Sequence, residues 1–225
     1  SCAVELLDNP LWAALTGPQA AFGTRHGRAA RFDPEVSPFA AVADPGDPAA
    51  WADLRELVKP GERVIVAAPG LTVPAGWAGD ELPGFQLIGP GYAGAPAAEA
   101  VALGAGDVPE MLDLRERTRP GPLERRTVEL GGYLGIRRGG ALVAMAGRRM
   151  RVPGWTEISA VCTDPAFRGA GLATRLIAAV TDGLRAEGDL PFLHVAADNT
   201  GAIRLYEHLG FAIRTPVTFA GVTPA

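Results

Sequence analysis

The segment from residue 156 to residue 174 constrains the fold of this chain more than any other stretch of its sequence. It reads TEISAVCTDPAFRGAGLAT and predicts a strand, an Asp-Pro break, a glycine-containing loop and then a long helix. The predicted helix, residues 172–187, carries leucine, isoleucine and valine on one stripe. This order places backbone amides at the positive end of a helix dipole, where phosphate groups bind. The glycines would equally allow a tight turn without a ligand, so the pattern alone leaves both interpretations open.

The remaining periodicities predict a mixed α/β chain. Strands are expected at residues 63–68, 84–88, 100–103, 133–137, 141–148, 156–163, 192–196 and 211–220. Helices are expected at residues 6–21, 48–58 and 200–209, and from residue 107 onward. After residue 98 the order is strand, helix, three strands, helix, strand, helix and strand, which indicates a mixed sheet covered by helices.

Two parts of the chain differ in composition, which predicts two domains. Residues 1–98 carry a net charge of −5 and much of the irregular proline and glycine content, whereas residues 99–225 carry a net charge of +1. We therefore expect a smaller α/β accessory domain over residues 1–98 and a second domain over residues 99–225. Each length fits the usual size range of a domain.

The composition also excludes several classes of function. Neither part has the basic excess of a nucleic-acid-binding protein, and no apolar run approaches the ~20 residues that cross a bilayer. His26, His194 and His208 lie too far apart for a zinc site, and Cys2 and Cys162 lack metal-ligand spacing. The first ten residues lack the basic segment of a secretory signal. We expect a cytoplasmic protein without a metal, and neither a membrane nor a nucleic acid as partner.

Two motifs carry a resemblance to a known family. The segment Arg168-Gly-Ala-Gly171-Leu-Ala173 matches the pattern [QR]xxGx[GA], and the segment from Asn199 to Phe211 matches NxxAxxLYxxxGF. Both patterns, in this order, resemble the GNAT superfamily of N-acetyltransferases over about residues 99–225. The resemblance implies a mixed, mainly antiparallel sheet whose central strand pair splays apart. Within the superfamily the chain looks closest to the glycine N-acyltransferase-like subgroup, in which the catalytic domain follows an N-terminal domain.

The resemblance further implies a site for acetyl-CoA as co-substrate. The slot between the splayed strands would hold the pantetheine arm, and the amides of the glycine loop would hold the pyrophosphate. The residues expected to bind acetyl-CoA are Val161, Thr163, Arg168, Gly169, Ala170, Gly171, Leu172, Ala173, Thr174, Asn199 and Ala202. The backbone amide of Val161 would donate to the thioester oxygen, and Tyr206 would be the general acid that protonates the departing thiolate.

Several of these side chains have a simpler structural interpretation. Glu157, beside the expected slot, is the candidate general base, but it would equally suit a salt-bridged strand residue. Tyr206 could simply anchor its helix by packing. His194 lies in mid-strand, where a hydrogen-bonded structural role is the more common one. Cys162 is expected to be a buried core residue and not a nucleophile.

The sequence therefore predicts direct acetyl transfer to an amine, on a small molecule or a peptide. The alternative is a non-catalytic acyl-CoA-binding regulatory module, since an intact binding pattern serves both. Residues 1–98 contain no second glycine-loop motif, so one CoA is expected per chain. This first part would shape the substrate site, be a diverged GNAT-like copy, or form a homodimer surface.

Overall fold

The computed structural model describes residues 3–225, and its main feature is an eight-stranded sheet. The strands are β4 (Val64–Ala68), β5 (Trp77–Ile88), β6 (Val101–Ala102), β7 (Leu134–Arg138), β8 (Ala141–Val152), β9 (Trp155–Thr163), β10 (Leu190–Ala196) and β11 (Ala212–Pro224). They lie in the order β4-β11-β5-β10-β9-β8-β7-β6. A separate three-stranded sheet contains β1 (Gly23–His26), β2 (Ala29–Phe32) and β3 (Ala40–Val42). Nearly all neighbours are antiparallel, which confirms the expected mixed, mainly antiparallel sheet.

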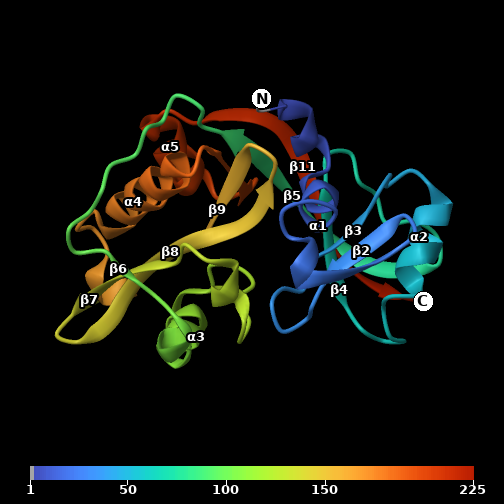
Figure 1. Cartoon of the computed structure of the whole chain (residues 1–225), viewed down its shortest axis with the longest axis horizontal. Helices are drawn as coiled ribbons and strands as arrows, with labels where there is room; N and C mark the ends of the chain where they lie inside the picture. Colours follow the sequence, from blue (N-terminus) through green and yellow to red (C-terminus); the bar gives the residue numbers. More distant parts are fainter. Residues whose placement is uncertain (1–2) are drawn as a thin grey trace.

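Helices cover both faces of the large sheet (Figure 1). They are α1 (Pro10–Leu15), α2 (Pro48–Arg55), α3 (Val108–Thr118), α4 (Leu172–Ala186) and α5 (Thr200–Leu209). Helices α4 and α5 share one hydrophobic cluster with the sheet, while α1 and α3 pack on the opposite face. Alternating residues of β10 show the two faces, because Leu193 and Val195 join the α4 cluster whereas Phe192 joins the α1 cluster. Within residues 3–225, no helix combines the length and apolar character needed to cross a membrane.

The large sheet runs across the expected domain boundary after residue 98. Strand β5, from the first part of the chain, lies between β10 and β11 and pairs with both. Its pairing with β11 extends from Trp77 to Ile88, and the far end of β11 continues the sheet onto β4 (Figure 1). The two parts therefore share one backbone hydrogen-bond network, and the fragment experiment below tests the expected division into two domains.

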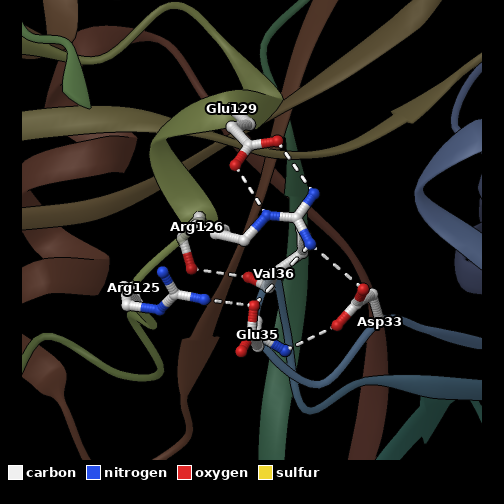
Figure 2. Close-up of polar contacts among 7 residues, drawn as sticks. Asp33, Glu35, Val36, Arg125, Arg126 and Glu129 are labelled. Carbon is white, nitrogen blue, oxygen red and sulfur yellow. Dashed lines mark hydrogen bonds and ion pairs between the residues drawn. The ribbon is translucent and has the colours of Figure 1, made fainter.

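A second contact between the two parts lies on the surface at Arg126 (Figure 2). The guanidinium of Arg126 binds both carboxylate oxygens of Glu129 and reaches Asp33 at 3.1 Å. Beside it the buried hydroxyl of Thr127 donates to the carbonyl of Val36 at 2.5 Å. The exposed ion pairs contribute little because water screens them, so the buried hydroxyl contact is the stronger anchor.

Most expected elements are confirmed, and the exceptions have local causes. The helix expected over residues 6–21 is divided into a 3-10 turn, Val4–Asp8, and the short helix α1, because Pro10 lacks an amide hydrogen and starts a new helix at its first position. The small sheet formed by β1, β2 and β3 was not expected. Its strands have three or four residues each, too few to show a clear alternation.

The shared sheet predicts that residues 99–225 do not fold alone. Removing residues 1–98 takes β4 and β5 away, which leaves the backbone groups of β10 without partners along one edge and those of β11 without partners along both edges. We expect this fragment to aggregate or to lack a cooperative thermal transition by circular dichroism. Co-expression with residues 1–98 should restore a soluble complex. A cooperative transition of the isolated fragment close to that of the full chain would contradict this prediction.

Candidate functional site

The candidate site is built on a fork between two parallel strands. β9 and β10 pair only from Trp155 with Leu190 to Glu157 with Phe192. Beyond that point β9 continues beside β8 and β10 continues beside β5. The expected splayed strand pair is confirmed, and its open end points toward Thr163 and the end of β10.

A bulge changes the direction of β9 within the fork. Ser159 pairs with Gly147 and Cys162 pairs with Met145, so two residues, Ala160 and Val161, lie opposite a single residue of β8. Ala160 has a φ of 56°, a left-handed conformation that costs an alanine on the order of 1–2 kcal/mol. Such backbone strain persists where the surrounding packing fixes the conformation. The strained residue precedes Val161, whose amide was expected to donate to the thioester oxygen.

The glycine loop leaves the backbone amides at the start of α4 uncovered by any side chain of the loop. Gly169 and Gly171 have φ values of 84° and 75°, which explains why glycine occupies both positions. Gly171 precedes the first turn of α4, and no side chain caps that turn. A Cβ added at either glycine would meet no atom within 4 Å, so open space lies above the loop. The uncapped amides and the helix dipole together fit an anionic ligand such as a pyrophosphate.

Arg175 holds the loop in this orientation, and sequence analysis did not identify it. Its guanidinium donates to the carbonyl of Ala170 at 2.8 Å and also pairs with Glu99. Because the carbonyl and amide of one trans peptide point in opposite directions, this contact turns the amide of Gly171 away from Arg175. Arg175 lies in the first turn of α4, where a positive charge is unfavourable because it opposes the helix dipole. That unfavourable position was the signal in the sequence that could have identified Arg175.

The other expected acetyl-CoA residues lie at the same end of the fork. Arg168 donates from its Nε to the carbonyl of Thr163 at 3.3 Å, which ties the loop to the end of β9. Asn199 caps α5 by accepting from the amide of Ala202 at 3.2 Å. The structure thus gives Asn199 a capping function, and contact with acetyl-CoA is a further expectation.

Tyr206 lies on α5 in the hydrophobic cluster that includes Val161 and Val195. Its ring packs edge-on against Phe211 with centroids 5.8 Å apart, so the anchoring role is present. Burial raises the pKa of Tyr206 to about 12, because the phenolate would be poorly solvated. The side chain therefore keeps its proton at neutral pH, as a general acid must.

Glu157 does not have the environment of a general base. It is fully buried at the closed end of the fork, where Arg149 binds it through two hydrogen bonds of 2.7 and 2.8 Å. His194 approaches its other side at 2.6 Å. Burial alone would raise the pKa of Glu157, but the charge and hydrogen bonds of Arg149 outweigh it and lower the pKa to about 2. The salt-bridged interpretation is therefore the one that fits, and the expected base role does not.

Two surface hollows lie away from the fork itself. One of about 430 Å³ lies in the first part of the chain, between Phe22, Arg31 and Lys59, and reaches Arg126. Another of about 340 Å³ lies between residues 95–99 and Arg175. The second is lined on one side by Arg175 and Ala178, so it lies beside α4, the helix that the glycine loop precedes. Cys162 is buried as expected.

Comparisons with known proteins agree with this geometry. Residues 133–219 match the family described as FR47-like protein. The chain is also similar to the crystal structure of an acetyltransferase from the GNAT family of Novosphingobium aromaticivorans. That likeness has 41% identity and a TM-score of 0.90, covering 97% of this chain and 98% of the other. The chain belongs to the GNAT family. The superfamily resemblance is thereby confirmed.

Further relatives are similar over shorter stretches or in fold. N-alpha-acetyltransferase RimI of Mycobacterium tuberculosis is 39% identical over 82 residues, which are 35% of this chain and 51% of that protein. Mycothiol acetyltransferase of Nocardiopsis dassonvillei is 46% identical over 59 residues, 25% of this chain and 18% of that protein. The match thus spans about half or less of these curated GNAT relatives. A GCN5-related N-acetyltransferase from Kribbella flavida, at 22% identity and TM-score 0.62, covers 96% of each chain and shares the fold.

We predict that Gly171→Ala weakens binding of CoA. Alanine disfavours the positive φ at this position, so the loop would relax and turn its amides. Gly188→Ala is the matched control, because Gly188 follows α4 with a φ of 90° and equally open surroundings. We expect both variants to lose similar stability in thermal melts, while calorimetry shows about tenfold weaker CoA binding for Gly171→Ala alone. Equal CoA affinity in the two variants would contradict the assignment of the loop.

We also predict that Glu157→Gln destabilises the protein in a pH-dependent way. The pKa of Glu157 is lower in the folded protein than its ordinary value of 4.5, so its ionisation stabilises the fold above pH 4.5 and this stabilisation is lost as the pH falls toward 2. Urea unfolding at pH 7 should show a loss of about 3–5 kcal/mol, because Arg149 remains buried without its counter-charge. The difference from wild type should shrink below pH 4.5. Glu129→Gln, at an exposed pair, should change little; a similar effect of both variants would refute the prediction.

Proposed function

We propose that this chain transfers an acetyl group from acetyl-CoA directly to an amine. The observation that carries the proposal is the fork between β9 and β10. Three features lie at its open end: the bulge of β9, the uncapped start of α4, and the helix α5 that carries Tyr206. Membership of the GNAT family supports the reaction class, and the two curated relatives are named as acetyltransferases.

The residues at the open end fit acetyl-CoA in chemistry and in space. We assign the pyrophosphate to the amides between Arg168 and Thr174, where glycines leave room and no side chain caps the helix. Val161 and Thr163 would pair with the pantetheine arm along the open edge of β9, with Asn199 and Ala202 facing it from α5.

Two groups of this chain would assist the transfer. Bound acetyl-CoA supplies the acetyl group as a thioester, whose sulfur leaves as a thiolate. The amide of Val161, within the bulge, would donate to the thioester oxygen as charge develops there. Tyr206 holds its proton at the phenol oxygen throughout the neutral pH range and would deliver it to the thiolate. The attacking amine loses one proton as the amide forms, and that proton would return to the phenolate through solvent, so acetyl-CoA and amine become CoA thiol and amide. Glu157 has no part in this proposal, because its carboxylate is committed to Arg149 and His194.

The acceptor is proposed as an amine on a small molecule or at a peptide N-terminus. Of the two relatives, one is named for acetylation at an α-amino nitrogen and the other for acetylation of mycothiol. Placement in the glycine N-acyltransferase-like subgroup, a cytoplasmic location and a homodimer stay predictions. One CoA per chain is expected, since only the second part carries the glycine loop.

The function is tested by thiol release from acetyl-CoA with a panel of free and blocked amines. We expect release with some free amines, and a loss of at least ~100-fold in kcat for Tyr206→Phe at unchanged KM for acetyl-CoA. Tyr92→Phe is the matched control. Tyr92 packs on the same Phe211 ring as Tyr206, and this substitution also removes one phenol hydroxyl, but not the hydroxyl of Tyr206. Binding of acetyl-CoA without turnover of any amine would overturn the proposed activity. Full kcat in Tyr206→Phe would overturn only the acid assignment.

A further inference from the structure

Three polar side chains lie buried on the face of the large sheet that packs against α1. They are Glu157 on β9, His194 on β10 and Gln86 on β5, three consecutive strands of the sheet. Glu157 and Gln86 are 0% exposed, and the side chain of His194 is 3% exposed. Burying such groups costs free energy unless every donor and acceptor is satisfied. The hydrogen bonds of these three side chains therefore determine their orientations and the positions of their protons.

The first link crosses the fork where backbone pairing ends. Glu157 and Phe192 form the last backbone pair between β9 and β10. His194 lies two residues beyond Phe192 and therefore on the same face, and its Nδ1 contacts Oε2 of Glu157 at 2.6 Å. This side-chain bond joins the two strands at the point where they begin to diverge.

The second link fixes the carboxylate from the other side. Arg149 on β8 binds Glu157 through Nε and Nη2, and the amide of Met150 donates to Oε1 at 3.2 Å. The guanidinium of Arg149 also lies 4.7 Å from the ring centre of Phe39, in the first part of the chain. A bidentate ion pair of this kind fixes geometry as well as charge. Glu157 thus offers His194 an immobile acceptor.

The third link determines which nitrogen of His194 carries the proton. Gln86 accepts from Arg214 at 2.9 Å through Oε1 and donates to the carbonyl of Leu7 at 2.8 Å through Nε2. Arg214 can only donate and a carbonyl can only accept, so the Gln86 amide has one orientation. Its Nε2, 3.2 Å from His194 Nε2, is then a donor, and His194 must accept there. The ring proton is consequently on Nδ1 and points at Glu157.

We propose that His194 and Glu157 are a positioning pair that sets the opening of the acetyl-CoA slot, with His194 held as the neutral Nδ1–H tautomer. The slot's ligand rests on the proposed function, whereas the tautomer does not. Neither side chain reaches solvent, so the pair acts by holding β9 and β10 and touches no substrate.

The surroundings of His194 agree with a neutral ring. Phe192 and Phe219 pack edge-on with centroids 5.8 and 5.4 Å away. The charged groups nearby are already paired, Glu157 with Arg149 and Arg214 with Asp8. A second ring proton, at Nε2, would face the Gln86 amide group donor to donor.

The tautomer is tested by nitrogen NMR of the full chain labelled at histidine. His194 is assigned by the signals that disappear in His194→Asn. We expect a protonated nitrogen at Nδ1 and an unprotonated one at Nε2. In Gln86→Glu, a carboxylate replaces the donor, so Nε2 should become protonated. A proton on Nε2 in the wild type, or an unchanged spectrum in Gln86→Glu, would overturn the proposal.

The positioning role is tested by His194→Asn against His194→Leu. The two replacements have nearly the same shape, but the asparagine amide nitrogen occupies the place of Nδ1 and can still donate to Glu157. We expect calorimetry to show near wild-type acetyl-CoA binding for His194→Asn and about tenfold weaker binding for His194→Leu, below both melting temperatures. Equal affinities in both variants would overturn the positioning role. A wild type that binds acetyl-CoA but transfers nothing would overturn the proposed function and leave this comparison intact. Should His194→Leu fail to fold, His194→Ala, which also lacks the donor, takes its place in the comparison.

Discussion

The divergence of β9 and β10 is the constraint on which the rest of the structure depends. A strand that leaves its neighbour exposes backbone donors and acceptors along its inner edge, so beyond the fork each strand is held in the sheet only by pairing along its outer edge. β9 keeps β8 as its partner, and β10 takes β5 from the first part of the chain. The slot can therefore exist only because β5 fills the position on the other side of β10.

This requirement explains why the first 98 residues are part of the same folded body. β5 and β11 form a long ribbon that pairs with β10 at one end and with β4 at the other. The small sheet and α1 then cover the face that the ribbon leaves open (Figure 1). In that interface Arg149 pairs with Glu157 and Arg214 pairs with Asp8, as the cost of burying an unpaired charge requires.

Local patterns in the sequence predicted the part of the site that is local in space. The glycine loop, α4 and α5 are each read from fewer than twenty consecutive residues, and their bounds agree with expectation. The insertion of β5 was missed because strand order depends on contacts between residues more than a hundred positions apart, such as Gln86 and His194. The bulge at Ala160 was missed for a related reason, since its positive φ is imposed by pairing with β8 and alanine gives no local signal.

The same limit accounts for Glu157, whose strand was predicted correctly but whose role, general base or salt-bridged residue, the sequence left open. Alternation along a strand shows which residues share a face, but the face becomes buried or open only through the elements that pack on it. Here α1 and β2 close that face, and Arg149 and His194 turn Glu157 into a fixed anion. Along β9, the residues of the proposed reaction lie at the open end of the fork, and the fixed ion pair of Glu157 lies at its closed end. In the function proposed here, Val161 and Thr163 would meet the ligand while Glu157, four and six residues earlier, holds the fork in place.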